Sequence, residues 1–107
     1  MLPLVQKGGD MDIIKTVGLP AFLEQLAEES AELAQASLKL ARKKRGENPS
    51  RKSEEDCLHD LAEEAADVTF CIDLLLKSGI IDEDVLEENR RSKAGGWESR
   101  LAARDKG

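Results

Sequence analysis

Two long stretches of this 107-residue chain repeat apolar or small residues at intervals of three and four. That spacing places the residues on one face of an α-helix, so both stretches are predicted to be long amphipathic helices. The first runs from residue 20 to about residue 45, and the second from about residue 54 to about residue 78. The predicted apolar faces consist of Leu23, Leu26, Ser30, Leu33, Ser37 and Leu40, and of Leu58, Leu61, Ala65, Val68, Ile72 and Leu75.

The composition favours helices throughout the chain. Leu, Ala, Glu, Lys and Arg are plentiful, whereas Phe22, Phe70 and Trp97 are the only aromatic residues, a balance typical of helices rather than strands. We therefore expect a single all-α domain over residues 1–107. Because two such helices cannot bury both of their apolar flanks, further copies are expected to complete a four-helix bundle as a homodimer or homotetramer.

Three segments lack this periodicity. Residues 1–10 are predicted to be a loose arm, residues 46–53 a flexible linker, and residues 94–107 a basic, glycine-containing tail into which the last helix dissolves. A short helix is predicted within residues 11–17, between the arm and the first long helix.

Capping residues mark the ends of the predicted helices. Gly18 is expected to end the short helix, and Pro20 is suited to open the first long one. Ser53 is a candidate N-cap for the second long helix, and Gly79 a candidate stop. A last helix is expected to begin near Asp82.

The charge pattern excludes two classes of partner. The net charge is −6, with acids and bases interspersed, so a basic surface for polymeric nucleic acid or for a membrane of anionic lipid is not expected. The apolar run at residues 1–5 is too short for a secretory signal, and no window has the length needed to cross a bilayer. We therefore expect a cytoplasmic protein.

The two cysteines are predicted to be reduced. Cys57 and Cys71 lie fourteen residues apart in one predicted helix, roughly 20 Å at the rise of an α-helix, which excludes a disulfide between them. A zinc site is not favoured, because only His59 lies near Cys57.

Each long helix carries a pair of acids three residues apart, Glu29 with Glu32 and Glu64 with Asp67. Residues at this spacing share one face of a helix, so each pair offers two oxygen ligands side by side. Glu29 and Glu64 also interrupt the apolar stripes, each lying three residues after a leucine and four before another apolar residue. A carboxylate in an apolar seam is costly unless it is paired, protonated or bound to metal. Since hard cations prefer oxygen ligands, the four acids are predicted to bind Mg²⁺, or alternatively Mn²⁺.

In this order and register the acids resemble the motif of the MazG-like all-α nucleoside triphosphate pyrophosphohydrolases, EExxE on one helix followed by ExxD on the next. The two elements read EESAE at residues 28–32 and EAAD at residues 64–67, and the likeness covers roughly residues 20 to 101. A second likeness lies in NRRSK at residues 89–93 and GGW at residues 95–97, which is similar to the basic, GG-aromatic end of these proteins.

The resemblance implies a MazG-like fold and a Mg²⁺-dependent hydrolase. Such an enzyme cleaves a nucleoside triphosphate between the α and β phosphates and releases the monophosphate and pyrophosphate, as in nucleotide-pool house-cleaning. The likeness assigns metal binding to the four acids Glu29, Glu32, Glu64 and Asp67. It assigns contact with the substrate phosphates to Asn89 and Lys93.

Two further acids are candidate general bases. Glu28 and Glu63 each lie next to a predicted metal ligand, and a crowd of acids raises the pKa of one of its members toward the range useful for proton transfer. The alternative, that both are exposed helix acids, is equally open.

Other functions are left open by the residues. Residues 7–20 contain no counterpart of the aromatic and histidine residues with which dCTP-specific members hold a pyrimidine, so the base is undetermined. Residues 74–86 look like those of phosphoribosyl-ATP pyrophosphatases, which is one alternative activity. A non-catalytic helical interaction module with exposed acids is another. A di-iron carboxylate protein would need Glu-x-x-His pairs, and the chain has none.

Overall fold

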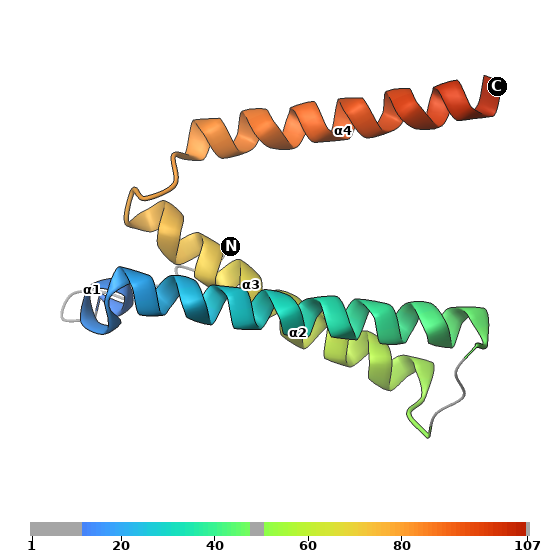
Figure 1. The fold of residues 1–107 in the computed structure, drawn as a ribbon, viewed down its shortest axis with the longest axis horizontal. Coiled ribbons are helices and arrows are strands. Elements are labelled where there is room, and N and C mark those ends of the chain that lie inside the picture. Colours follow the sequence, from blue (N-terminus) through green and yellow to red (C-terminus); the bar gives the residue numbers. More distant parts are fainter. Residues whose placement is uncertain (1–11, 48–50, 107) are drawn as a thin grey trace. The chain divides into compact units, whose positions relative to one another are not determined.

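The computed structural model describes residues 12–47 and 51–106, and all regular secondary structure within these ranges is helical. The helices are α1 (Ile13–Val17), α2 (Leu19–Arg45), α3 (Glu54–Lys77) and α4 (Glu83–Lys106) (Figure 1). The prediction of an all-helical chain is therefore confirmed over the described ranges. The predicted arm at residues 1–10 and the middle of the predicted linker, residues 48–50, lie outside them.

Gly18 separates α1 from α2. The N-terminus of α1 is capped by Asp12, whose carboxylate accepts a hydrogen bond from the Lys15 backbone N–H at 3.1 Å. Gly18 then ends α1 with φ 91°, a conformation that favours glycine, and α2 begins at the next residue. Pro20 lies in the first turn of α2, where the helix has no use for its missing N–H. The predicted roles of Gly18 and Pro20 are confirmed.

Side-chain caps also begin the two later helices. The Ser53 hydroxyl accepts a hydrogen bond from the Asp56 backbone N–H at 3.0 Å, which confirms the predicted N-cap of α3. Gly79 follows the end of α3 with φ 80°. The Asp82 carboxylate accepts from the backbone N–H groups of Asp84 and Val85 at 2.8 and 3.1 Å, and α4 starts at the expected place.

The predicted dissolution of the last helix at residues 94–107 is wrong. Helix α4 continues through Gly95 and Gly96 to Lys106. Each glycine weakens a helix by only about 1 kcal/mol relative to alanine, and alanine, leucine, arginine and other good helix formers surround the pair. The segment remains basic in part, but it is helical as far as the structure describes it.

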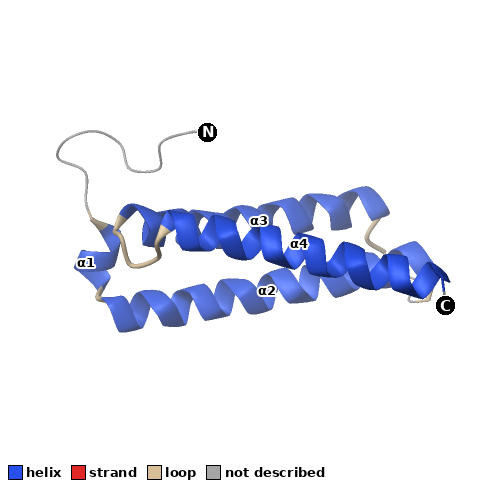
Figure 2. Cartoon of the chain, turned by 90° about the horizontal axis from the view of Figure 1, so that it is seen from above, coloured by secondary structure: helices blue, strands red, loops and turns tan. Residues whose placement is uncertain are grey.

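The chain divides into two compact units, Met1–Leu74 and Leu75–Gly107. In the first unit α2 and α3 lie side by side and run in opposite directions (Figures 1 and 2). Lys44 near the end of α2 and Glu54 at the start of α3 join the helices through an ion pair of 2.7 Å. The second unit consists of the last turn of α3, the following turn and α4.

The surface along which α2 and α3 meet is called here the α2–α3 seam. Its residues are all buried or half-buried and recur at intervals of four and three. The buried members include Phe22 and Ala36 on α2, and Cys57 and Cys71 on α3. The full set is Phe22, Leu26, Glu29, Leu33, Ala36 and Leu40 on α2, and Cys57, Leu61, Glu64, Val68 and Cys71 on α3.

The observed seam differs from the predicted apolar faces at several positions, where a neighbouring residue faces inward instead of the predicted one. Leu23 and Leu58 are 43% and 46% exposed, so they lie outside the seam. The hydroxyls of Ser30 and Ser37, also predicted on the inner face, are exposed and donate to carbonyls of their own helix at 2.8 and 2.9 Å. Turning Phe22 inward instead buries a larger side chain, which favours the observed rotation of α2.

The remaining general predictions concern thiols and membranes. Both cysteines are free and buried, as expected from their separation along one helix. None of the helices within the described ranges combines the length and apolar character needed to span a bilayer.

Candidate functional site

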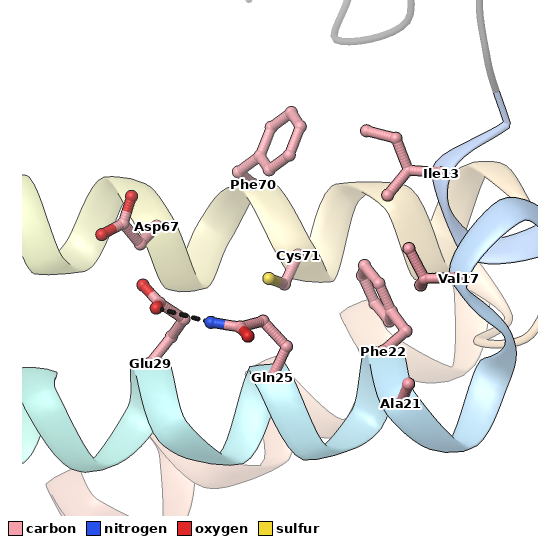
Figure 3. Close-up of a pocket in the computed structure, with 9 residues that line it drawn as sticks. All are labelled: Ile13, Val17, Ala21, Phe22, Gln25, Glu29, Asp67, Phe70 and Cys71. Carbon is pink, nitrogen blue, oxygen red and sulfur yellow. Dashed lines mark hydrogen bonds between the residues drawn. The ribbon is translucent and has the colours of Figure 1, made fainter.

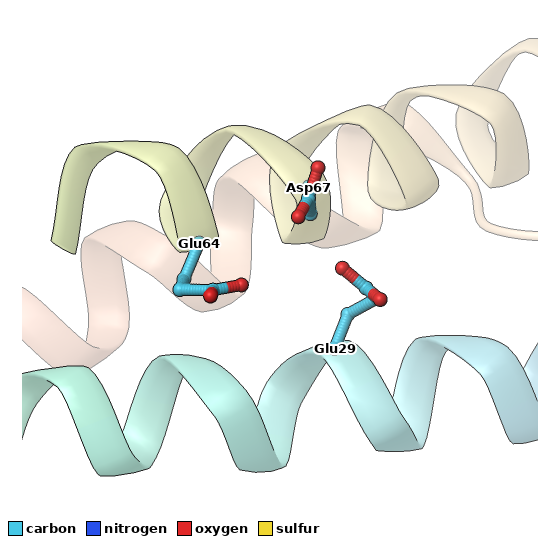
Figure 4. Close-up of side chains that lie close together, drawn as sticks. All are labelled: Glu29, Glu64 and Asp67. Carbon is cyan, nitrogen blue, oxygen red and sulfur yellow. The ribbon is translucent and has the colours of Figure 1, made fainter. Parts of the chain in front are cut away.

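Three carboxylates from two helices converge at the middle of the α2–α3 seam. Glu29 comes from α2, and Glu64 and Asp67 come from α3 (Figure 4). One oxygen from each side chain lies within 4.8 Å of the others. Glu29 and Glu64 are half-buried and Asp67 is exposed, so the cluster has one side in the seam and one side open to solvent. We call these three residues the acidic cluster.

Local helix geometry explains why these side chains meet. Glu64 and Asp67 are three residues apart and so project from one side of α3. Glu29 occupies a seam position of α2, between the half-buried Leu26 and Leu33. Because α2 and α3 run in opposite directions, the middle of one helix faces the middle of the other.

Hydrogen bonding dominates the electrostatics of Glu29. A hydrogen bond with the Asp67 carboxylate raises the pKa of Glu29, and partial desolvation and the negative charge of Asp67 raise it further. Gln25 opposes this effect, since its side-chain amide donates to Glu29 Oε1 at 3.0 Å (Figure 3). The net effect favours the protonated form of Glu29.

Desolvation dominates the electrostatics of Glu64. Burial against the seam raises the pKa of Glu64, followed by repulsion from the Glu32 and Asp67 carboxylates. Both half-buried members of the acidic cluster thus resist ionisation. A cation between them would remove that resistance, because it offsets the repulsion that favours the protonated forms.

The donor set of the acidic cluster suits a hard divalent cation. Its ligands are carboxylate oxygens only, which Mg²⁺ and Mn²⁺ prefer over softer metals. One oxygen of each carboxylate lies within 4.8 Å of the other two, so the three side chains are close enough together to share one cation.

Glu32, the fourth predicted ligand, is not part of the acidic cluster. Its side chain is exposed and lines a separate polar cavity, together with Glu64. Glu32 is nevertheless close enough to raise the pKa of Glu64 by repulsion. The structure thus brings together three of the four predicted ligands and leaves Glu32 beside them.

None of the predicted general bases and phosphate contacts belongs to the acidic cluster. Glu28 and Glu63 are exposed and are not among the described residues that line either cavity discussed below. Asn89 and Lys93 are exposed residues of α4, in the second unit, where the Asn89 amide donates to the Val85 carbonyl at 2.9 Å. The roles predicted for these four residues stay predictions.

An apolar cavity of about 450 Å³ adjoins the acidic cluster on the side of α1 (Figure 3). Glu29 and Asp67 form one end of it, and the rings of Phe22 and Phe70 line its walls from α2 and α3. Cys71 also lines this cavity, and burial followed by the nearby carboxylates raises the pKa of its thiol. Its volume falls within the range of small-molecule sites in proteins.

A polar cavity of about 330 Å³ lies at the other end of the cluster. Two lysines line it, Lys39 from α2 and Lys52 from the segment before α3. Lys52 forms an ion pair with Asp60, which also lines the cavity, and this contact lowers the pKa of Asp60. Glu32, Gln35, Glu64 and the buried Cys57 also line this cavity.

Neither cavity was predicted from the sequence. The two phenylalanines carried a usable signal, because Phe22 lies four residues before Leu26 in the α2 stripe and Phe70 lies three residues after Asp67. Lys39 and Lys52 carried none, since they belong to different segments and meet only when α2 and α3 pair.

Comparison with known proteins adds no relative. No family model, no curated protein and no solved structure matches the chain.

Proposed function

We propose that the protein is a divalent-metal-dependent nucleoside triphosphate pyrophosphohydrolase. The observation that carries this proposal is the acidic cluster, in which three carboxylates from two helices approach within 4.8 Å beside a cavity large enough for a small molecule. The order of acids that resembles MazG-like enzymes supports the same reaction.

Several features of the site fit this reaction. Glu29 and Glu64 are half-buried with raised pKa values, a costly arrangement that a bound cation would relieve. Asp67 is exposed, which keeps one side of the site open to a substrate. The two phenylalanine rings of the apolar cavity offer faces on which a nucleobase can stack.

The reaction balances without any further reactant. A water oxygen bonds to a phosphorus of the α–β anhydride while the bond from that phosphorus to the bridging oxygen breaks. One product is the nucleoside monophosphate, and the other is pyrophosphate. Bound Mg²⁺ would neutralise phosphate charge and lower the pKa of a coordinated water.

The carboxylates of the chain are proposed to bind the metal and to accept a proton. Glu29, Glu64 and Asp67 would hold the cation, and a carboxylate would take the proton that the attacking water loses. Glu28 and Glu63 are the acids proposed to accept this proton. Because both residues are exposed, either would accept it through a water bound to the substrate. Glu32 is proposed to join the metal shell by rotating from the adjacent polar cavity.

The decisive experiment is a product analysis. Nucleoside triphosphates, deoxynucleoside triphosphates and phosphoribosyl-ATP are incubated with the protein and Mg²⁺, and pyrophosphate and orthophosphate are measured separately. We expect pyrophosphate as the first product from at least one substrate. Orthophosphate as the first product, or no turnover of any substrate with Mg²⁺ or Mn²⁺, would refute the proposal. Phosphoribosyl-ATP as the preferred substrate would select the alternative activity.

Variants of the acidic cluster test the assignment of residues. Glu29→Ala and Asp67→Ala are expected to abolish Mg²⁺-dependent pyrophosphate release while leaving the helical circular dichroism unchanged. Glu24→Ala is a matched control, because Glu24 is an exposed acid of the same helix outside the cluster. Unchanged turnover in both cluster variants would reject the assignment.

The assembly and cellular context are part of the proposal. Large apolar side chains of the first unit, Leu23, Leu38, Leu58 and Phe70, are 37–57% exposed, which supports burial against a second copy in a homodimer or homotetramer. A cytoplasmic enzyme that removes unwanted nucleotides would fit this activity.

A further inference from the structure

The acidic cluster lies between two cavities of opposite character. Toward α1, the cavity walls are apolar and include two aromatic rings. Toward the α2–α3 connection, the cavity is polar and contains two lysines. Glu29 and Asp67 belong to the first cavity and Glu64 to the second, so the cluster is continuous with both.

The two cavities differ most clearly in their cations. Among the described residues that line the apolar cavity there is no lysine or arginine, and its charged groups are the carboxylates of Glu29 and Asp67. The end of a substrate that carries several negative charges is therefore disfavoured there. In the polar cavity Lys39 and Lys52 offer ammonium donors to such a group.

The polar cavity also contains three acids, Glu32, Asp60 and Glu64. The proposed function assigns Glu32 and Glu64 to the metal, which leaves Asp60 as the acid beside the lysines. Lys52 is held by Asp60, and the same contact lowers the pKa of Asp60 and raises that of Lys52, so both remain charged. Lys39 contributes to the lowered pKa of Asp60 through its charge alone. Lys39 and Lys52 thus line the same cavity and both interact with the charge of Asp60, so an additional anion bound there can interact with both ammonium groups.

Position along the helix agrees with one extended ligand. The apolar cavity reaches Gln25 and Glu29 on α2, and the polar cavity reaches Gln35 and Lys39. Ten residues separate Gln25 from Gln35, which is about 15 Å of helix at 1.5 Å per residue. The acidic cluster lies between these points, as a metal site must if it acts on the anhydride in the middle of the ligand.

We propose that the substrate lies along the α2–α3 seam with its base in the apolar cavity and its β and γ phosphates in the polar cavity, where Lys39 and Lys52 bind them. This inference rests on the proposed function and adds to it a direction and two phosphate-binding residues. The pyrophosphate product then leaves from the side of Lys39 and Lys52, and the monophosphate from the side of Phe22 and Phe70.

Product inhibition of the wild-type and variant enzymes tests the direction. In Lys39→Ala with Lys52→Ala, we expect the inhibition constant for magnesium pyrophosphate and the KM for the triphosphate to rise about five- to ten-fold, allowing for the exposure of both side chains. The inhibition constant for the nucleoside monophosphate should change less than about two-fold, because the monophosphate makes no contact with the two lysines in this orientation. Lys44→Ala is the matched control, because Lys44 also pairs with an acid of α3 but does not line the cavity.

The two native cysteines give a second, independent readout. Cys71 lines the apolar cavity and Cys57 the polar one. With a small methylthiolating reagent, the monophosphate should slow modification of Cys71, measured in Cys57→Ser. Magnesium pyrophosphate should slow modification of Cys57, measured in Cys71→Ser. The reverse pattern of protection would show that the ligand lies in the opposite direction.

The outcomes separate this inference from the proposed function. Pyrophosphate release that is intact in wild type, combined with pyrophosphate inhibition that is insensitive to both lysine substitutions, overturns the inference and leaves the function standing. Loss of monophosphate binding in the lysine variants overturns it as well. A wild-type enzyme that hydrolyses no triphosphate overturns both.

Discussion

The glycine pair within α4 offers a test of the continuous helix. Gly95 and Gly96 lie in the interior of α4, and neither has a positive φ. A Cβ at Gly95 would meet nothing within 4 Å, and a Cβ at Gly96 would lie 3.3 Å from Arg100 Nη1, the end of a flexible side chain. Both positions therefore accept alanine without strain.

The expected gain follows from helix propensity. Alanine is favoured over glycine by about 1 kcal/mol per position in a helix interior, so Gly95→Ala with Gly96→Ala should stabilise α4 by ~2 kcal/mol. A change of this size alters an opening equilibrium by up to about thirty-fold. We expect the amide protons of α4 to exchange correspondingly more slowly when exchange is governed by opening of this helix.

The assay is hydrogen exchange of the α4 amides in the full chain, with helical circular dichroism beside it. Gly46→Ala and Gly79→Ala are controls in which the same substitution should lower stability instead of raising it. These glycines have φ 70° and 80°, a conformation in which alanine is strained. Exchange of α4 at the wild-type rate or faster in the double alanine variant would contradict a helix that runs through residues 95 and 96. Lower triphosphate turnover in a more stable variant would indicate that the bare glycine backbone serves the substrate.

Further predictions concern the acidic cluster, the α3 cap and the assembly. Because the pKa values of Glu29 and Glu64 are raised in the fold, the metal-free protein binds protons more tightly than the unfolded chain and loses stability as pH rises through those values. The rise in Tm caused by millimolar Mg²⁺ should therefore be larger at about pH 7.5, where the carboxylates are ionised, than at about pH 4.5, where protons compete with the metal. A Tm shift that does not depend on pH would count against metal binding by these carboxylates. Ser53→Ala should cost about 1 kcal/mol in urea unfolding and Ser53→Asp should cost little, since aspartate also caps helices; equal losses in the two variants would contradict the capping role. Light scattering at micromolar concentration is expected to give the mass of a dimer or tetramer, and a monomer mass would reject the proposed assembly.

Local features of this chain were predictable because local interactions decide them. The N-caps at Ser53 and Asp82, the helix break at Gly18 and the opening of α2 near Pro20 all depend on residues within one turn of one another. The spacing of the acids along each helix is likewise a property of the sequence. Glycine at positions 95 and 96 was misleading for a related reason, because a local preference against helix was outweighed by the residues on both sides.

The composition of the candidate site required the pairing of α2 with α3. On α2 the observed seam keeps the predicted Leu26, Leu33 and Leu40. It contains Phe22, Glu29 and Ala36 in place of the predicted Leu23, Ser30 and Ser37. The pairing of the two helices placed Glu29 against Asp67 and left Glu32 in the cavity of Lys39 and Lys52. Which of several neighbouring residues faces inward depends on the shape of the partner helix, and a periodic pattern along one helix contains no information about that shape.

The sequence by itself determined that the chain forms helices, where most of them begin and end, and that acids interrupt two apolar stripes. The tertiary structure decided which acids share a site and which cavities adjoin it, because residues far apart in the chain meet only through packing. Backbone hydrogen bonds and caps act within a few residues, whereas side-chain packing between helices selects one rotation among several that the sequence pattern permits.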